Sequence, residues 1–175
     1  MSSDAAHALP DLIVPDLKVV FVGTAAGKRS KELGQYYAGR GNRFWATLHE
    51  IGLTPHRFEP GEFRELLPLG IGLTDMSKLG FGMDHEIDAE DYDPDLFDEN
   101  MRHYRPRAVA FTSKMAASVW KRGAPTTGIN FGRQTRNAAN DPEFFVLPSP
   151  SGAARSYWSI EPWEELAAWL RERQT

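Results

Sequence analysis

Three short apolar runs stand out along the chain, at residues 19–22, 108–112 and 144–147. Each is rich in β-branched or aromatic residues and too short for a helix, which predicts strands buried on both faces. A fourth apolar segment at 69–75, interrupted by two glycines, predicts a short strand or tight turn that ends in the acid Asp75.

Between these runs, apolar residues recur three or four positions apart, as they do along one face of a helix. This spacing predicts helices at 44–51, 60–67, 94–101, 114–120 and 163–170. Residues that favour the start of a helix precede three of them, namely Asn42, Asp93 and Ser113. Strands that alternate with helices predict an α/β fold with a parallel sheet covered on both faces.

The two stretches without periodicity, 80–91 and 124–142, are expected to form loops, the first acidic and exposed. A chain of 175 residues can bury one core, so we expect a single domain over 1–175, with 1–12 as a flexible N-terminus. The absence of cysteine excludes disulfides, zinc–thiolate sites and iron–sulfur clusters, and it fits a cytoplasmic protein. The sequence shows no secretory signal and no run near the roughly 18 apolar residues of a membrane span, so no membrane contact is expected.

The net charge of −4 is unevenly distributed. Residues 1–45 carry six Lys or Arg against four Asp or Glu, and residues 101–175 carry eleven against six. Residues 46–100 carry three against fourteen, so the acidity lies in the middle third. The two basic outer thirds allow a local surface that attracts DNA, and the alternative is solvated charge scattered over the whole surface.

A loop of small residues follows the first apolar run and consists of Gly23, Thr24, Ala25, Ala26 and Gly27. Small residues let the backbone approach a ligand closely, and open α/β sheets bind ligands at the carboxyl ends of their strands. We therefore place the binding site at this loop. It is followed by Lys28 and Arg29, by the pair Tyr36 and Tyr37, and by the sequence N-R-F-W that starts at Asn42.

The stretch from residue 17 to residue 45 resembles the first motif region of the mismatch-specific uracil/thymine-DNA glycosylases. In that family a buried strand ends in G-I-N-P-G, an aromatic residue follows, and N-R-F-W begins the next helix. Gly23, Gly27, Tyr37 and the run 42–45 match these features. The motif asparagine, which is catalytic in most of the family, is replaced by Ala25.

A second loop, V-L-P-S-P-S-G in the third apolar run, resembles the family motif V-L-P-N-P-S-G. By this resemblance Ser149 replaces an asparagine that contacts the opposite strand, Ala153 stands where a larger apolar wedge enters the base stack, and Arg155 matches a nearby basic residue. Because alanine fills a stack poorly, Arg155 or another loop is expected to assist base flipping. The alternative is a proline-stiffened connection between strand and helix. The residues expected to contact DNA are Lys28, Arg29, Ser149, Pro150, Ser151, Gly152, Ala153 and Arg155.

Hydrolysis of an N-glycosidic bond needs a group that orients water and favours a cationic sugar, and a carboxylate does both. Asp75 is the candidate because it ends an apolar, strand-like run, and the alternative is an N-cap for a following helix. The resemblance implies a branch of the family in which this acid replaces the missing asparagine. Tyr37 is expected to stack on the base, and the amides of the loop are expected to hold its carbonyl. The residues expected to bind the base are Gly23, Thr24, Ala25, Ala26, Gly27, Tyr37 and Asn42.

The five histidines show no metal-ligand spacing, and the glycine loop is neither a phosphate-binding nor a dinucleotide-binding motif. No metal and no cofactor are therefore expected. The resemblance implies a three-layer α/β/α sandwich and a monomeric, monofunctional uracil-DNA glycosylase of base excision repair, which flips uracil out of DNA and hydrolyses its N-glycosidic bond. Two alternatives stay open: a glycosylase for hypoxanthine or xanthine, and a DNA-damage binding protein without catalysis.

Overall fold

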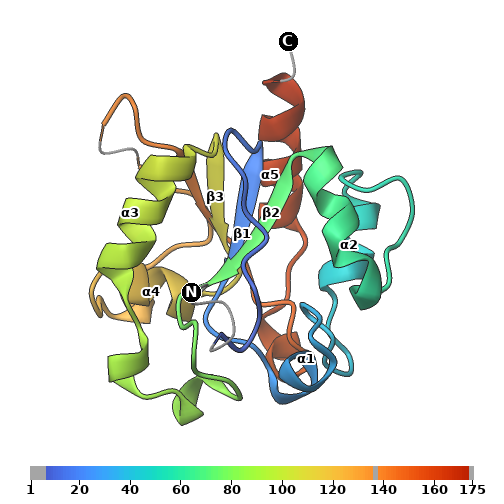
Figure 1. The fold of residues 1–175 in the computed structure, drawn as a ribbon. Coiled ribbons are helices and arrows are strands. Elements are labelled where there is room, and N and C mark those ends of the chain that lie inside the picture. The colour runs from blue at the N-terminus through green and yellow to red at the C-terminus, as the bar shows by residue number, and fades with distance from the viewer. Residues whose placement is uncertain (1–6, 136–137, 174–175) are drawn as a thin grey trace.

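The computed structural model describes residues 7–135 and 138–173. A five-stranded sheet runs through its centre, with the strand order β2-β1-β3-β5-β4 (Figure 1). Four of these strands are parallel, and β4 pairs antiparallel with β5 at one edge. The bounds of the strands are β1 Val19–Gly23, β2 Ile71–Asp75, β3 Ala108–Phe111, β4 Gly132–Arg133 and β5 Glu143–Val146.

Helices cover both faces of the sheet (Figure 1). The helices α2 and α5, together with the 3₁₀ helix η2, pack on one face, and α3 and α4 pack on the other. The predicted α/β/α sandwich is therefore confirmed. The bounds of these helices and of the short α1 are α1 Lys28–Leu33, α2 Phe44–Glu50, η2 Pro60–Leu69, α3 Pro94–Tyr104, α4 Lys114–Trp120 and α5 Glu161–Glu172.

Alternate residues of β1 point into two separate cores. Val19 and Phe21 belong to the core beneath α2 and α5, where the ring of Phe21 stacks on Trp163 with centroids 5.8 Å apart. Val20 and Val22 belong to the core beneath α3 and α4. Full burial of one such side chain stabilises a fold by about 1.5–3 kcal/mol. The apolar run that predicted this strand therefore contributes side chains to both cores.

Two predicted N-caps are present. The Asp93 carboxylate accepts a hydrogen bond from the backbone N–H of Leu96 at 3.0 Å and begins α3. The Ser113 hydroxyl accepts one from the N–H of Ala116, also at 3.0 Å, and begins α4. These bonds satisfy N–H groups that have no partner within the helix. None of the helices in the described residues combines the length and the apolar character of a membrane span.

The described part of the segment 124–142, which excludes residues 136–137, is more structured than its sequence predicts. It contains a 3₁₀ turn, Thr126–Gly128, and the two-residue strand β4. Within that strand Gly132 lies opposite Val146 and Arg133 opposite Phe145. A strand of two residues has no periodicity of its own, so its formation depends on the partner strand and cannot be predicted from local pattern.

Residues 7–12 correct the expected flexible N-terminus. Leu12 exchanges two backbone hydrogen bonds with Leu73 of β2, each 2.9 Å long, and the N–H of Ala8 donates to the carbonyl of Lys78 at 2.7 Å. Leu9 and Leu12 are buried in the core. The apolar side chains of this segment explain its docking, because they leave water when it packs beside β2. Residues 1–6, the rest of that expectation, lie outside the described residues.

The strand register gathers several chain segments at one edge of the sheet. Gly23 lies opposite Asp75 where β1 pairs with β2, and Val22 lies opposite Phe111 where β1 pairs with β3. The loop after β1, the end of β2 and Thr112 after β3 therefore meet at the carboxyl ends of the strands. This is the edge at which ligands of open α/β sheets bind.

Candidate active site

A cleft of about 520 Å³ opens at the carboxyl edge of the sheet. It contains Asp75, every residue predicted to bind a base, and the residues predicted to contact DNA except Gly152 and Arg155. Segments far apart in the sequence thus form one site. Residues of the cleft that the sequence analysis did not assign to the site include Asp84, Thr112, Ser113 and Tyr157.

Asp75 lies at the end of β2, and only 8% of its surface is exposed. Among the described residues, none donates a hydrogen bond to its carboxylate. Burial raises the pKa of Asp75 to about 7. The nearby Lys78 ammonium lowers this pKa, and the Asp11 carboxylate raises it further. The alternative role as a helix N-cap is not seen, because no helix follows it directly. A carboxyl group with a pKa near neutrality is suited to exchange a proton with water.

Gly23 lets this carboxylate lie against the backbone. A Cβ atom placed on Gly23 would be 2.4 Å from Oδ1 of Asp75 and 3.4 Å from the hydroxyl of Tyr37. A separation of 2.4 Å is far inside van der Waals contact, so no other residue type fits here without displacing Asp75. The first glycine of the loop therefore has a steric role toward the acid.

A charged network supports the far side of Asp75. Asp11 Oδ1 accepts hydrogen bonds from Lys78 Nζ and from the Thr74 hydroxyl, each at 2.7 Å, and Lys78 also donates to Thr74. Asp11 and Lys78 are both largely buried. Their opposite charges act in opposite directions on Asp75, which leaves burial as the main cause of its raised pKa.

The loop from Gly23 to Gly27 is tied to the segment that follows β2. The carbonyls of Gly23, Thr24 and Ala26 accept hydrogen bonds from later backbone N–H groups at 2.8–2.9 Å. The Thr24 hydroxyl also lies 3.2 Å from that of Ser113. Among the described residues no acceptor is bonded to the N–H of Ala25, which lines the cleft. This amide is therefore a donor available to a ligand.

Tyr37 is held at both ends of its side chain. Its ring stacks on Phe44 with centroids 3.9 Å apart and planes 19° apart, and its hydroxyl lies 3.1 Å from that of Thr112. Burial raises the pKa of the Tyr37 phenol, so it stays neutral. Its backbone adopts a left-handed conformation with φ of 52°. One face of the ring rests on Phe44 while the side chain also lines the cleft, which is the arrangement that stacking on a base requires.

Asn42 supports the start of α2 from one residue before Arg43, which holds the N-cap position that the sequence assigned to Asn42. Its Oδ1 accepts a hydrogen bond from the N–H of Phe44 at 2.9 Å. Asn42 also lines the cleft, so its predicted contact with a base stays a prediction. Tyr36, the residue before Tyr37, is buried and donates from its hydroxyl to the carbonyl of Pro10 at 2.8 Å, which makes it a structural residue.

The two motif loops touch each other. The N–H of Arg43 donates to the carbonyl of Pro150 at 2.8 Å, and a Cβ atom on Gly152 would lie 3.0 Å from the carbonyl of Arg40. Ser149 accepts a hydrogen bond at its hydroxyl from the N–H of Ser151 at 3.3 Å. The second loop is therefore fixed along one wall of the cleft.

The family profile of the uracil DNA glycosylase superfamily matches residues 10–171. This chain belongs to that superfamily. It is also similar in structure to a proposed uracil DNA glycosylase from Methanosarcina acetivorans that was solved by NMR, with a TM-score of 0.63 and 22% sequence identity. The match covers 94% of this chain and 95% of that one and supports the shared fold. Membership of the superfamily supports a DNA glycosylase role for this chain.

The acidic segment 80–91 borders the cleft. The sequence predicted only that this segment forms an exposed loop. Asp84 lines the cleft. Glu86 Oε1 lies 3.9 Å from Lys28 Nζ, within ion-pair distance. Partial desolvation in the cleft raises the pKa of Asp84, although much of its surface is exposed, and a hydrogen bond with Thr24 and the charge of His85 lower that pKa. Periodicity could not reveal this position, because it arises where the segment folds back onto the glycine loop.

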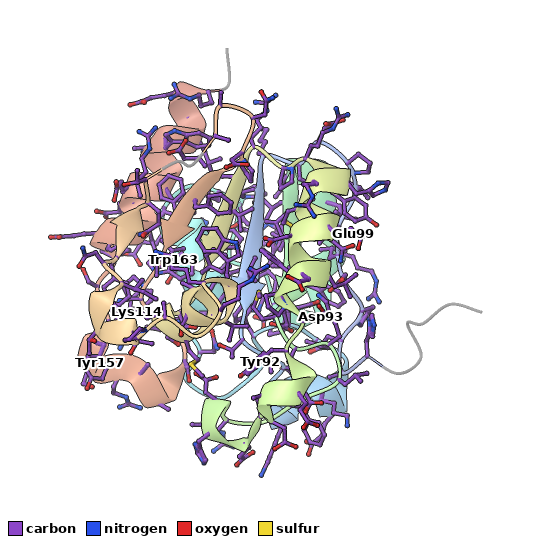
Figure 2. The ribbon with its side chains drawn as sticks, turned by 90° about the vertical axis from the view of Figure 1, so that its left-hand side faces the viewer. Tyr92, Asp93, Glu99, Lys114, Tyr157 and Trp163 are labelled. Carbon is purple, nitrogen blue, oxygen red and sulfur yellow. The ribbon has the colours of Figure 1, made fainter. Side chains whose placement is uncertain are left out.

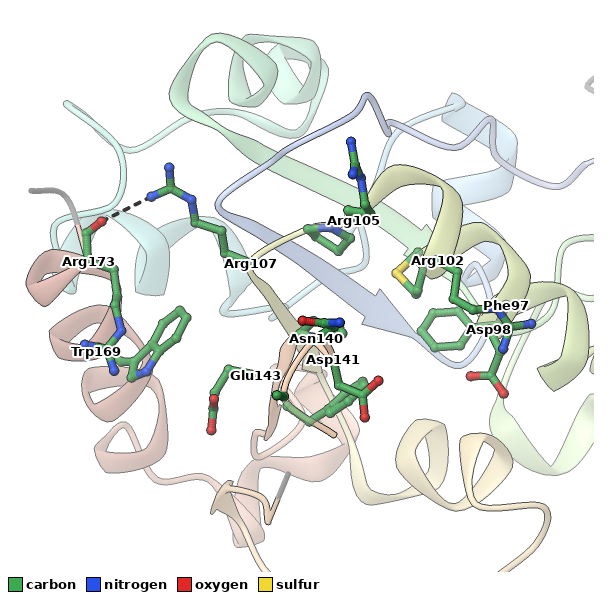
Figure 3. Close-up of a pocket in the computed structure, with 15 residues that line it drawn as sticks. Phe97, Asp98, Arg102, Arg105, Arg107, Asn140, Asp141, Glu143, Trp169 and Arg173 are labelled. Carbon is green, nitrogen blue, oxygen red and sulfur yellow. Dashed lines mark hydrogen bonds between the residues drawn. The ribbon is translucent and has the colours of Figure 1, made fainter. Parts of the chain in front are cut away.

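A larger hollow of about 840 Å³ lies at the opposite edge of the sheet (Figure 3). Several arginines line it, but Figure 3 shows Arg105 and Arg107 pointing in different directions. Arg107 donates to the backbone carbonyl of Arg173 at 3.1 Å. Because its cations do not converge on one point, this hollow is a weaker candidate for a ligand site than the smaller cleft.

One group of side chains has the composition of a metal site. Ligand atoms of His56, Glu62 and Glu65 lie within 4.8 Å of one another. Glu62 already accepts a hydrogen bond from the N–H of Glu59 and caps η2. The group lines none of the hollows described above, so it has no evident link to the cleft.

Replacing both Lys28 and Arg29 with glutamine is expected to weaken the salt dependence of DNA binding. Both side chains are exposed at the cleft, and each phosphate contact contributes about 0.9 to the slope of log affinity against log salt. The slope should fall by roughly one to two units, measured by fluorescence anisotropy. Replacing Arg102 and Arg105, at the opposite edge, is the matched control. An equal fall in both double variants would contradict a phosphate-binding role at the cleft.

Proposed function

We propose that this protein is a monofunctional uracil-DNA glycosylase of the mismatch-specific type. The observation that carries the proposal is the buried Asp75 carboxylate, which lies against Gly23 and lines the same cleft as the glycine loop and Tyr37. Its substrate is DNA that contains uracil, and the products are free uracil and an abasic site. Ala25 stands where the family motif has a catalytic asparagine, and in this proposal Asp75 takes over the role of that asparagine.

The base enters the cleft after extrusion from the DNA duplex and stacks on the ring of Tyr37. In this proposal the backbone N–H of Ala25 donates to a carbonyl of the base. As the bond between C1′ and the base nitrogen breaks, its electron pair passes to the base, and the amide stabilises the resulting anion. Ala25 thus contributes through its backbone, which the change of side chain leaves intact.

Asp75 acts on the sugar and on water. Its carboxylate stabilises the positive charge that develops at C1′ and orients a water molecule toward that carbon. The water oxygen bonds to C1′, and Asp75 accepts the proton that the water releases. This role needs the ionised form, so the group must be deprotonated at the pH of the reaction.

An excision assay on a lesion panel tests this proposal. Duplexes with uracil, thymine, hypoxanthine or xanthine at one position are incubated with excess enzyme, and abasic sites are detected by alkaline cleavage. We expect abasic sites with uracil, and their loss with Asp75→Asn protein purified in the same way, which excludes a contaminating activity. Preferred excision of hypoxanthine or xanthine would show that this base, and not uracil, is the substrate. Tight binding of lesion DNA without any abasic sites would make the protein a damage-binding protein.

A further inference from the structure

Tyr157 is the most exposed large apolar or aromatic side chain among the described residues, with 77% of its surface accessible. It ends the 3₁₀ helix η6, Gly152–Tyr157, which follows the second motif loop. It also lines the same cleft as Tyr37 and Asp75. Figure 2 shows it at the edge of the molecule, on the same side as Lys114. An aromatic ring is therefore presented to solvent at the rim of the active-site cleft.

The residues on both sides of Tyr157 are anchored. The Ser151 hydroxyl accepts a hydrogen bond from the N–H of Ala153 and caps η6. Trp158, the next residue, packs against the buried Trp163 with ring centroids 5.9 Å apart. The guanidinium carbon of Arg43 lies over the Trp158 ring, 5.3 Å from its centroid. The exposed ring thus projects from a supported turn.

Neither residue that the motif suggests for filling a base stack is suited to it here. Ala153 ends at its Cβ atom and offers little surface. Arg155 donates from Nε to the carbonyl of Gly152 at 3.3 Å, which holds its side chain against its own turn. Tyr157 supplies what both lack, a flat apolar surface that faces outward beside the cleft.

We propose that Tyr157 enters the duplex beside the extruded nucleotide and stacks on the base that this nucleotide leaves. This inference rests on the proposed glycosylase function. Extrusion removes the stacking partner of the neighbouring base, and an aromatic side chain replaces that partner through its π face. Base–aromatic stacking of this kind corresponds to roughly a tenfold to hundredfold change in an equilibrium. Tyr157 thereby stabilises the extruded state, while Tyr37 stacks on the extruded base itself.

The test compares Tyr157→Ala with Tyr157→Phe in proteins that also carry Asp75→Asn, so that the substrate stays intact. The probe is a duplex with 2-aminopurine opposite uracil, whose fluorescence changes when uracil leaves the duplex and the base pair is lost. We expect Tyr157→Ala to lower the equilibrium constant of extrusion about tenfold and Tyr157→Phe to retain most of it. Tyr104→Ala, a partly exposed tyrosine at the end of α3, is the matched control.

Excision rates of the single variants on duplex and single-stranded uracil DNA complete the test. The ratio of duplex rate to single-strand rate should fall about tenfold in Tyr157→Ala, because only the duplex leaves a gap to fill. An unchanged ratio, or an equal loss in Tyr104→Ala, would overturn the inference, as would an absent fluorescence change in the protein with intact Tyr157. Failure of the glycosylase proposal is distinguishable: no abasic sites would form on any substrate, while a fluorescence change that depends on Tyr157 would still support stacking.

Discussion

Replacing Asp75 with asparagine is expected to lower the single-turnover rate of uracil excision by roughly 10²-fold or more, the usual contribution of a positioned acid or base. Asparagine keeps the size of the side chain but can neither accept the proton of water nor balance charge on the sugar. Affinity for uracil-containing DNA should persist, because Tyr37 and the loop amides are unchanged. Rapid-quench measurement with excess enzyme checks the rate, and fluorescence anisotropy checks the affinity. An unchanged rate would remove Asp75 from the reaction.

The pH dependence of excision gives an independent check on the same residue. The pKa of Asp75 is raised to about 7 by burial, so its reactive carboxylate is the minor form at lower pH. The rate of the unmodified protein should rise about tenfold per pH unit up to about pH 7 and level off above it. The residual activity of Asp75→Asn should lack this titration. A rate that is flat between pH 5 and about 8 would contradict a general-base role.

Asp75 also affects stability, and the sign of this effect separates catalysis from folding. Its pKa rises from 3.8 in the unfolded chain to about 7 in the folded protein. The favourable contribution of the neutral acid is therefore present below pH 3.8 and is lost as pH rises toward about 7. At pH 8 the ionised, buried carboxylate lowers stability by at most about 4 kcal/mol. Asp75→Asn should thus melt no lower than the unmodified protein at pH 8, so its lost activity cannot be attributed to unfolding.

Replacing Gly23 with alanine is expected to lower excision by a similar factor of about 10² and to destabilise the protein by about 1–3 kcal/mol. The added Cβ atom would lie 2.4 Å from Oδ1 of Asp75, so the carboxylate and the end of β2 must move away. The loss should appear in the chemical rate and as a lower melting temperature.

Gly27→Ala is the matched control, because it lies in the same loop and its added Cβ atom meets nothing within 4 Å. Its φ of −69° suits alanine. We expect a melting temperature close to that of the unmodified protein and a smaller loss of excision than in Gly23→Ala, because Asp75 is not displaced. A Gly23→Ala variant as active as Gly27→Ala would show that the close approach of Asp75 to the backbone is not needed for catalysis.

The layers of this fold could be predicted from the sequence because they depend on local pattern. The apolar run at 19–22 is recognisable as a strand, and its alternate residues supply both cores of the sandwich. Asp93 and Ser113 marked helix starts because a short polar side chain satisfies nearby N–H groups within its own segment. Local pattern could not reveal β4 or the docking of residues 7–12, since each depends on a partner far away in the chain.

The candidate site shows the same division between local and distant causes. The sequence by itself singled out the glycine loop, Tyr37 and Asp75, because each belongs to a motif or ends an apolar run. Only the tertiary structure decided that Gly23 lies opposite Asp75, and that the acid is buried deeply enough for its pKa to rise to about 7. It also brought Tyr157 to the rim of the same cleft. Strand register, burial and the docking of a turn arise from contacts between distant segments, which no local pattern of residues contains.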